Sequence, residues 1–99
     1  MDQSTALKSA KQYADIIRST MDTRQIFLFG SYAKGVANKD SDIDIAVLVD
    51  HMPSDYLSTL TLLWQATYDV NNSIEPILLV AGDSRGGLLQ EVLKTGITI

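Results

Sequence analysis

The sequence has no cysteine and few basic residues. The absence of cysteine excludes a disulfide framework, a thiolate metal site and a cysteine nucleophile. Eight Lys and Arg residues against twelve Asp and Glu residues give a formal net charge of −4. Because binding to nucleic-acid phosphates needs a positive field, this balance argues against a partner made of duplex DNA or RNA. It still allows a small phosphorylated substrate that is carried with metal ions.

Long hydrophobic runs are also missing. No segment approaches the roughly 20 apolar residues that span a membrane, and the polar first 19 residues lack the apolar stretch of a signal peptide. We therefore expect a cytoplasmic protein with no membrane partner. The 99 residues, 45% of them hydrophobic, fit one small domain over residues 1–99. The oligomeric state stays open, a homo-oligomer included.

Hydrophobic periodicity predicts three helices. Residues 4–20 form an amphipathic helix whose buried positions are Ala6, Ala10, Tyr13 and Ile17. A second helix begins near Pro53 and runs to about Tyr68, with an apolar stripe made of Leu57, Leu60, Trp64 and Tyr68. We expect Trp64 and Tyr68 to belong to the core or to a partner surface. After a loop over residues 81–85, a short third helix covers residues 87–95.

Three short segments, residues 25–29, 42–49 and 74–80, are predicted strands, and residues 97–99 can add a fourth. In the second, apolar positions (Ile43, Ile45, Val47, Val49) alternate with Asp42, Asp44, Ala46 and Leu48. A short loop joins the first two strands, which favours antiparallel pairing, whereas a helix joins the second and third, which favours a parallel crossover. The sequence therefore predicts an α/β (α+β) fold, a small mixed sheet with helices packed on it.

These connections bring polar residues from three strands to one edge of the predicted sheet. Gly30 and Ser31 follow the first strand, Asp42 and Asp44 open the second, and Glu75 opens the third. Asp42 and Asp44 are two residues apart and leave the same face, with Cα atoms roughly 6.6 Å apart. Carboxylates at that spacing repel unless a cation lies between them, and Mg²⁺ prefers such oxygen ligands. Two such ions can clamp the oxygens of a phosphoryl transfer.

The segment GSYAKG, residues 30–35, supplies the phosphate side of the predicted site. Gly30 lets the backbone approach a phosphate, Ser31 adds a hydroxyl donor, and Lys34 can reach a triphosphate. The surrounding loop can hold one helical turn after Ser31. Against this stand plainer interpretations. The two aspartates can be solvated charges on an exposed strand, and Glu75 and Lys34 ordinary surface residues.

Two other motifs fail because the sequence lacks residues that they require. An EF-hand calcium loop would need glycine where Ile45 stands and an acid where His51 stands. A Walker phosphate loop would need Lys-Ser directly after Gly35, where Val36 follows instead. We interpret His51 as a surface turn residue. We expect Asp50, about 20 Å of strand beyond Asp44, to stay outside the site.

The pattern Gly30-Ser31, ten residues, then Asp42-x-Asp44 resembles the signature of the minimal nucleotidyltransferases of the DNA polymerase β-like superfamily. The resemblance extends over the whole chain and implies their nucleotidyltransferase fold. It implies that Asp42 and Asp44 hold two Mg²⁺ ions and that the Gly-Ser turn binds the triphosphate. Glu75 is the candidate for the third acidic residue, although the family usually has Asp there.

The resemblance also implies an activity, the transfer of a nucleoside monophosphate, AMP from ATP, to a hydroxyl group. Family members pair with HEPN toxins, and some modify a tyrosine of that partner. We therefore expect an antitoxin of this type, with ATP and a HEPN protein as partners. Larger relatives carry an additional domain that contributes to acceptor binding, which 99 residues cannot hold, so we expect the acceptor to belong to another macromolecule. The alternative is a non-catalytic module that masks its partner.

Overall fold

The computed structural model describes residues 2–38, 40–82 and 87–99, and its elements follow the predicted order. They are α1 (Gln3–Thr20), β1 (Gln25–Phe29), α2 (Gly30–Lys34), β2 (Ile43–Val49), α3 (Tyr56–Thr67), β3 (Ile74–Val80), α4 (Leu88–Thr95) and β4 (Ile97–Thr98). The helical turn expected after Ser31 starts one residue earlier, at Gly30. The predicted loop 81–85 lies partly outside the described residues. Over the described ranges, no helix has the length and apolar character needed to cross a membrane.

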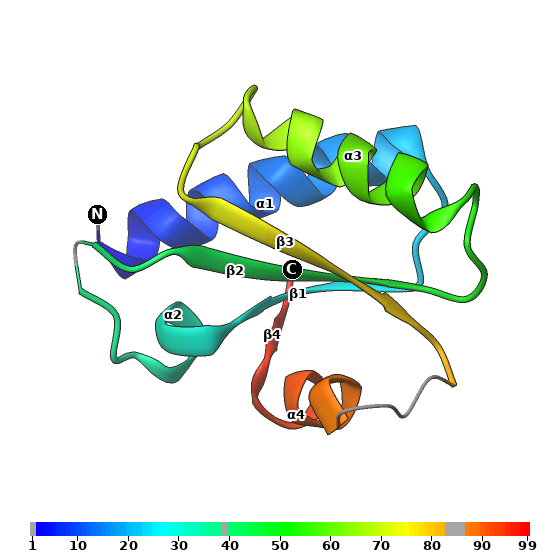
Figure 1. The fold of residues 1–99 in the computed structure, drawn as a ribbon. Coiled ribbons are helices and arrows are strands. Elements are labelled where there is room, and N and C mark those ends of the chain that lie inside the picture. Colours follow the sequence, from blue (N-terminus) through cyan, green and yellow to red (C-terminus); the bar gives the residue numbers. More distant parts are fainter. Residues whose placement is uncertain (1, 39, 83–86) are drawn as a thin grey trace.

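The four strands form one mixed sheet in the order β3-β2-β1-β4. β1 runs antiparallel to β2 and to β4, whereas β2 and β3 are parallel and are joined through α3. Helices α1 and α3 cover one face of this sheet, and α4 lies on the other (Figure 1). The prediction of a small mixed sheet with helices packed on it is confirmed.

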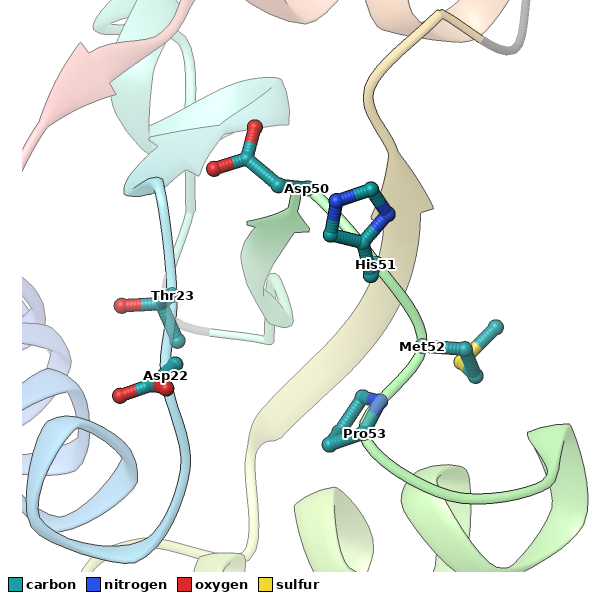
Figure 2. A pocket seen from close by; sticks show the side chains of 6 residues that line it. All are labelled: Asp22, Thr23, Asp50, His51, Met52 and Pro53. Carbon is teal, nitrogen blue, oxygen red and sulfur yellow. The ribbon is translucent and has the colours of Figure 1, made fainter.

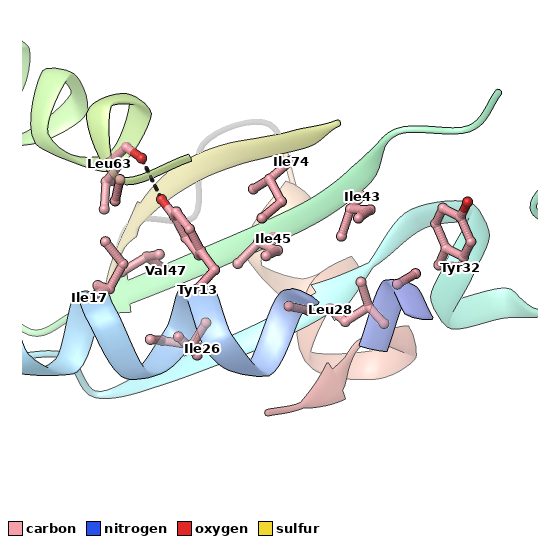
Figure 3. Close-up of a cluster of buried hydrophobic side chains, with 14 of the residues drawn as sticks. Tyr13, Ile17, Ile26, Leu28, Tyr32, Ile43, Ile45, Val47, Leu63 and Ile74 are labelled. Carbon is pink, nitrogen blue, oxygen red and sulfur yellow. Dashed lines mark hydrogen bonds between the residues drawn. The ribbon is translucent and has the colours of Figure 1, made fainter. Parts of the chain in front are cut away.

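The main core lies between the sheet and the helices α1 and α3 (Figure 3). The four alternate residues of β2 that face these helices are fully buried: Ile43, Ile45, Val47 and Val49. They meet the predicted buried positions of α1, which are also inaccessible. The Tyr13 hydroxyl donates a 2.6 Å hydrogen bond to the Leu63 carbonyl and so joins α1 to α3. Burial raises the pKa of Tyr13, so the phenol keeps its proton and remains a donor.

A second, smaller cluster fills the space between the opposite sheet face and α4. It consists of Phe27, Ala46, Leu48, Leu89 and Val92. Because side chains alternate along a strand, Ala46 and Leu48 leave β2 on the same side as Asp44. The apolar cluster on this face therefore has fewer buried residues, and at the start of β2 the side chain on this face is a carboxylate.

The apolar stripe predicted for α3 is not the face that packs on the core, so of the two alternatives for Trp64 and Tyr68 the core is wrong and a partner surface stays a prediction. The helix is buried through Thr59, Leu63, Ala66 and Thr67, whereas Leu57, Trp64 and Tyr68 are exposed and Leu60 is half-buried. Two of the buried residues are threonines whose hydroxyls bond to helix carbonyls, Thr59 to Asp55 at 2.9 Å and Thr67 to Trp64 at 2.7 Å. These bonds remove the desolvation cost of the hydroxyls, so small side chains let α3 approach the core closely.

Candidate active site

The strand register brings the predicted acidic residues to one end of β2. Asp44 pairs with Phe29 of β1 on one side and with Glu75 of β3 on the other. Residues in register on neighbouring strands share a face, and their strands lie about 4.8 Å apart, so Asp44 and Glu75 leave the sheet side by side. Asp42 lies just before β2 and is exposed. Carboxylates that are distant in sequence therefore meet at this edge.

Gly30 lies directly against Asp44. Its φ of +72° is in the left-handed region, and a Cβ added there would collide with the Asp44 carboxylate and lie 3.3 Å from the Asp44 Cβ. Glycine satisfies both demands, since it adopts positive φ at little cost and has no side chain. The backbone where β1 passes into α2 is thereby brought against a half-buried carboxylate.

Contacts from α1 and from within the turn hold residues 30–35 in place. Tyr32 is buried, and its carbonyl accepts a 2.9 Å hydrogen bond from the Gln3 side chain of α1. The Ser31 carbonyl accepts from the backbone N–H of Val36 at 3.0 Å, while Gly35, at a φ of +73°, ends the helix. Ser31 itself is half-buried and follows Gly30 at the start of α2.

Burial and the neighbouring carboxylates at this edge change the pKa of Asp44. The pKa of Asp44 is raised to about 6, first by burial and then by the negative charges of Glu75 and Asp42. An ionised Asp44 is thus unfavourable in a site that presents mainly negative charge. A cation bound between these groups would remove both the repulsion and part of the desolvation cost.

Lys34 does not provide that positive charge directly. Its ammonium Nζ lies 3.6 Å from Glu91 Oε1 on α4, and both side chains are largely exposed. No sequence pattern indicated Glu91, because this pairing depends on how α4 packs against the sheet. To reach a triphosphate, Lys34 would first have to leave this surface ion pair, and such pairs contribute only about 0–1 kcal/mol.

The donor set at the edge suits a hard divalent cation, because it offers carboxylate oxygens and no thiolate or imidazole. The positions of the side chains suit a metal ion less well than their chemistry does. Within residues 2–38, 40–82 and 87–99, no three His, Cys, Asp or Glu side chains are close enough to hold one metal ion together. Asp42 and Glu75 are exposed, so rotation of their side chains toward Asp44 meets little packing resistance.

A separate hollow lies at the opposite end of β2 (Figure 2). It has a volume of about 300 Å³ and is lined by Asp22, Thr23, Asp50, His51, Met52 and Pro53. Asp50 pairs with Arg24, with 3.1 Å between Oδ1 and Nη1, and His51 is exposed. About 20 Å of strand separates Asp50 from Asp44, so this hollow is not part of the carboxylate edge.

Comparison with known proteins places the chain in a family. The family model described as polymerase beta, nucleotidyltransferase, matches residues 11–99. The chain belongs to this nucleotidyltransferase family. The predicted resemblance is confirmed, and Gly30, Ser31, Asp42 and Asp44 all fall within the matched range.

Two curated relatives match shorter segments. The protein adenylyltransferase MntA of Thermococcus cleftensis is 45% identical over 38 residues, 38% of each chain. MJ0141 of Methanocaldococcus jannaschii, provisionally named a protein adenylyltransferase, is 39% identical over 44 residues, 44% of this chain and 42% of that protein. The matched segments thus span less than half the length of these relatives.

Solved structures share the fold over nearly the whole chain. A crystal structure from Sulfolobus solfataricus, provisionally named a nucleotidyltransferase, has a TM-score of 0.71 at 21% identity and covers 97% of this chain and 80% of that one. A crystal structure described as a toxin–antitoxin with AMP-PNP has a TM-score of 0.59 at 25% identity, covering 99% and 72%. The arrangement of sheet and helices is therefore shared with both of these structures.

Proposed function

We propose that this chain, as one domain over residues 1–99, transfers AMP from ATP to a hydroxyl group of a partner protein in a Mg²⁺-dependent reaction. The observation that carries the proposal is the contact set around Asp44, which has Glu75 beside it on β3 and the Gly30 backbone against its carboxylate. Membership of the nucleotidyltransferase family and the adenylyltransferase names of two relatives support the reaction class.

The carboxylates have the metal-binding role in this proposal. Asp42 and Asp44 hold the cations, with Glu75 as the third carboxylate. The pKa of Asp44, raised by burial and by its acidic neighbours, reflects a negative charge that the cations must neutralise. Two Mg²⁺ ions bound there would neutralise phosphate charge and acidify the acceptor hydroxyl. The β2 strand anchors Asp44 through its buried neighbours Ile43 and Ile45, which fixes the carboxylate relative to the sheet.

The turn after β1 has the nucleotide-binding role. The missing side chain of Gly30 leaves its space to the Asp44 carboxylate, so in this proposal a phosphate meets the turn through its backbone and through the Ser31 hydroxyl, which is a donor. Lys34 approaches the triphosphate by exchanging Glu91 for a phosphate oxygen. AMP-PNP, an ATP analogue, is present in the toxin–antitoxin structure that shares this fold, which supports ATP as the substrate.

The reaction is an in-line displacement at the α-phosphorus. The acceptor oxygen bonds to phosphorus, the bond to the bridging β-phosphate oxygen breaks, and pyrophosphate leaves. The hydroxyl proton passes to a carboxylate at this edge. Catalysis here consists of positioning and charge neutralisation, because little covalent chemistry is asked of the protein.

The acceptor in this proposal is a tyrosine of a HEPN-type toxin in the cytoplasm, and modification of that tyrosine neutralises the toxin. The fold shared with a toxin–antitoxin structure supports a protein partner of this kind. Masking of the toxin without chemistry is the competing function, and the same experiment separates the two.

The test is transfer of label from ATP labelled at the α-phosphate to the product of the neighbouring gene, with Mg²⁺ present. We expect the Asp42→Asn/Asp44→Asn variant to lose several kcal/mol of transition-state stabilisation, on the order of 10³-fold in rate. Asp50→Asn, directly after the far end of β2, is the matched control, and it should label the partner as the wild type does. Neutralisation that survives the double substitution without label would establish masking instead.

A further inference from the structure

The outward face of α3 carries an apolar stripe that no described element covers. At about 100° per residue, Leu57, Thr61, Trp64 and Tyr68 lie within about 60° of one another around the helix. Leu57 is 72%, Trp64 41% and Tyr68 79% exposed. The stripe extends about 16 Å along the helix axis and lies opposite the buried residues Leu63 and Ala66.

The charge pattern of this face is unusual for a solvated helix. No charged residue occurs from Tyr56 to Tyr68, whereas Asp55 and Asp69 stand at the two ends and are exposed. Asp55 caps α3 by accepting the Ser58 N–H at 2.9 Å, so its negative charge is held at the helix start. The cores of protein interfaces are depleted in charged residues and enriched in Trp and Tyr, and this face has the same composition.

We propose that this outer face of α3 docks an amphipathic helix of another protein, one whose apolar stripe is flanked by Lys or Arg. Charge complementarity selects this occupant. Packing α3 against α3 of a second copy would bring the acidic ends together in either orientation, between chains that each carry a net charge of −4. The acidic ends and the net charge likewise disfavour an anionic lipid surface.

The docking face is separate from the carboxylate edge. Helix α3 covers the sheet face on which Ile43 and Ile45 are buried, whereas Asp44 leaves β2 on the opposite face. A helix bound on α3 therefore leaves Asp44 and Glu75 accessible. The inference does not depend on catalysis, and its test needs no nucleotide, so either proposal can fail alone.

The test selects binders from a displayed library of 18-residue helical peptides, randomised in a stripe and at the flanking positions. Enriched peptides are then titrated as synthetic helices against the intact chain. Trp64 is the only tryptophan, so its emission reports contact at the face itself. We expect enriched peptides with an apolar stripe and Lys or Arg flanks, a blue shift of Trp64, and weaker binding at high salt.

Two variants and one control define the outcome. Leu57→Ser/Tyr68→Ser and, separately, Thr61→Lys should weaken binding at least tenfold, and both change exposed positions that leave the core intact. Leu93→Ser removes an apolar side chain of α4 that is 52% exposed and lies outside the α3 face, and this variant should bind as the wild type does. Equal binding by wild type and variants would overturn the proposal, as would enriched peptides without basic flanks. Wild-type dimers in sedimentation that Leu57→Ser/Tyr68→Ser abolishes would also overturn it, in favour of a second copy.

Discussion

The two faces of strand β2 differ in what they bury. On one face Ile43, Ile45, Val47 and Val49 are sealed by α1 and α3. On the other, Leu48 and Ala46 meet a small cluster with α4, and the row ends at Asp44, a carboxylate with a raised pKa. One strand thus supplies four residues of the main core on one side and a carboxylate of the candidate site on the other.

This division between the two faces shows how a small chain can tolerate carboxylates that repel each other. An ionised, partly buried Asp44 beside Glu75 lowers stability unless a cation is present. The thick apolar face offsets that cost and fixes the strand, so the carboxylate keeps its place. If this division is correct, changes on one face should affect folding, and changes on the other should affect chemistry.

The largest expected effect on folding comes from the thick face. Ile45→Ala removes a fully buried side chain between the sheet and α1, and we expect a loss of about 2–5 kcal/mol of unfolding free energy. Leu48→Ala, on the α4 face, should lose an amount near the lower end of that range, because its cluster is smaller. Denaturant melts of both variants measure the difference. An equal or larger loss for Leu48→Ala would contradict the asymmetry of the two faces.

A smaller effect on stability is expected at the turn after β1, where Gly30 lies against Asp44. Gly30→Ala and Gly35→Ala both place alanine at a φ near +72°, which costs about 1–2 kcal/mol in each. At Gly30 the added Cβ also collides with Asp44, whereas at Gly35 nothing lies within 4 Å. Displacement of Asp44 by an ångström should lower AMP transfer on the order of 10²-fold in Gly30→Ala alone. Similar transfer rates in the two variants would show that the contact with Asp44 is unimportant.

Much of this architecture could be predicted from the sequence, because its signals are local. The alternation of β2 identified its buried face, and the connection lengths gave the antiparallel and parallel pairings that the structure shows. Placement of Asp44 beside Glu75 followed from those pairings. Such inferences hold where strand period and loop length leave few alternatives.

The rest depended on tertiary packing. Helix α3 contains apolar residues around much of its surface, so periodicity alone did not identify its buried side, and threonines with satisfied hydroxyls took the place of Leu57 and Trp64. The pairing of Lys34 with Glu91 also needed the position of α4, which no local pattern encodes. Sequence patterns therefore predicted strands and their pairings better than helix orientation.

The smallest expected effect is a pH dependence of stability that originates at Asp44. Its pKa is about 6 in the folded protein against an ordinary 3.8, so the folded state binds this proton more tightly. The contribution of this group to the unfolding free energy therefore rises as pH falls from about 6 toward 4, and it is lowest above pH 6. Asp2 and Asp55, whose pKa values are lowered by hydrogen bonds to backbone N–H groups, act below this window and with the opposite sign.

Denaturant melts of the metal-free protein between pH 7 and pH 4.5 measure this contribution when the wild type is compared with Asp44→Asn. The difference between the two unfolding free energies should shrink as pH falls, because protonation gives the wild type the neutral side chain that the variant always has. At pH 7 the variant should be the more stable of the two without metal. Parallel pH profiles would show that Asp44 carries no charge penalty, and the two faces of β2 would then differ in shape but not in electrostatic cost.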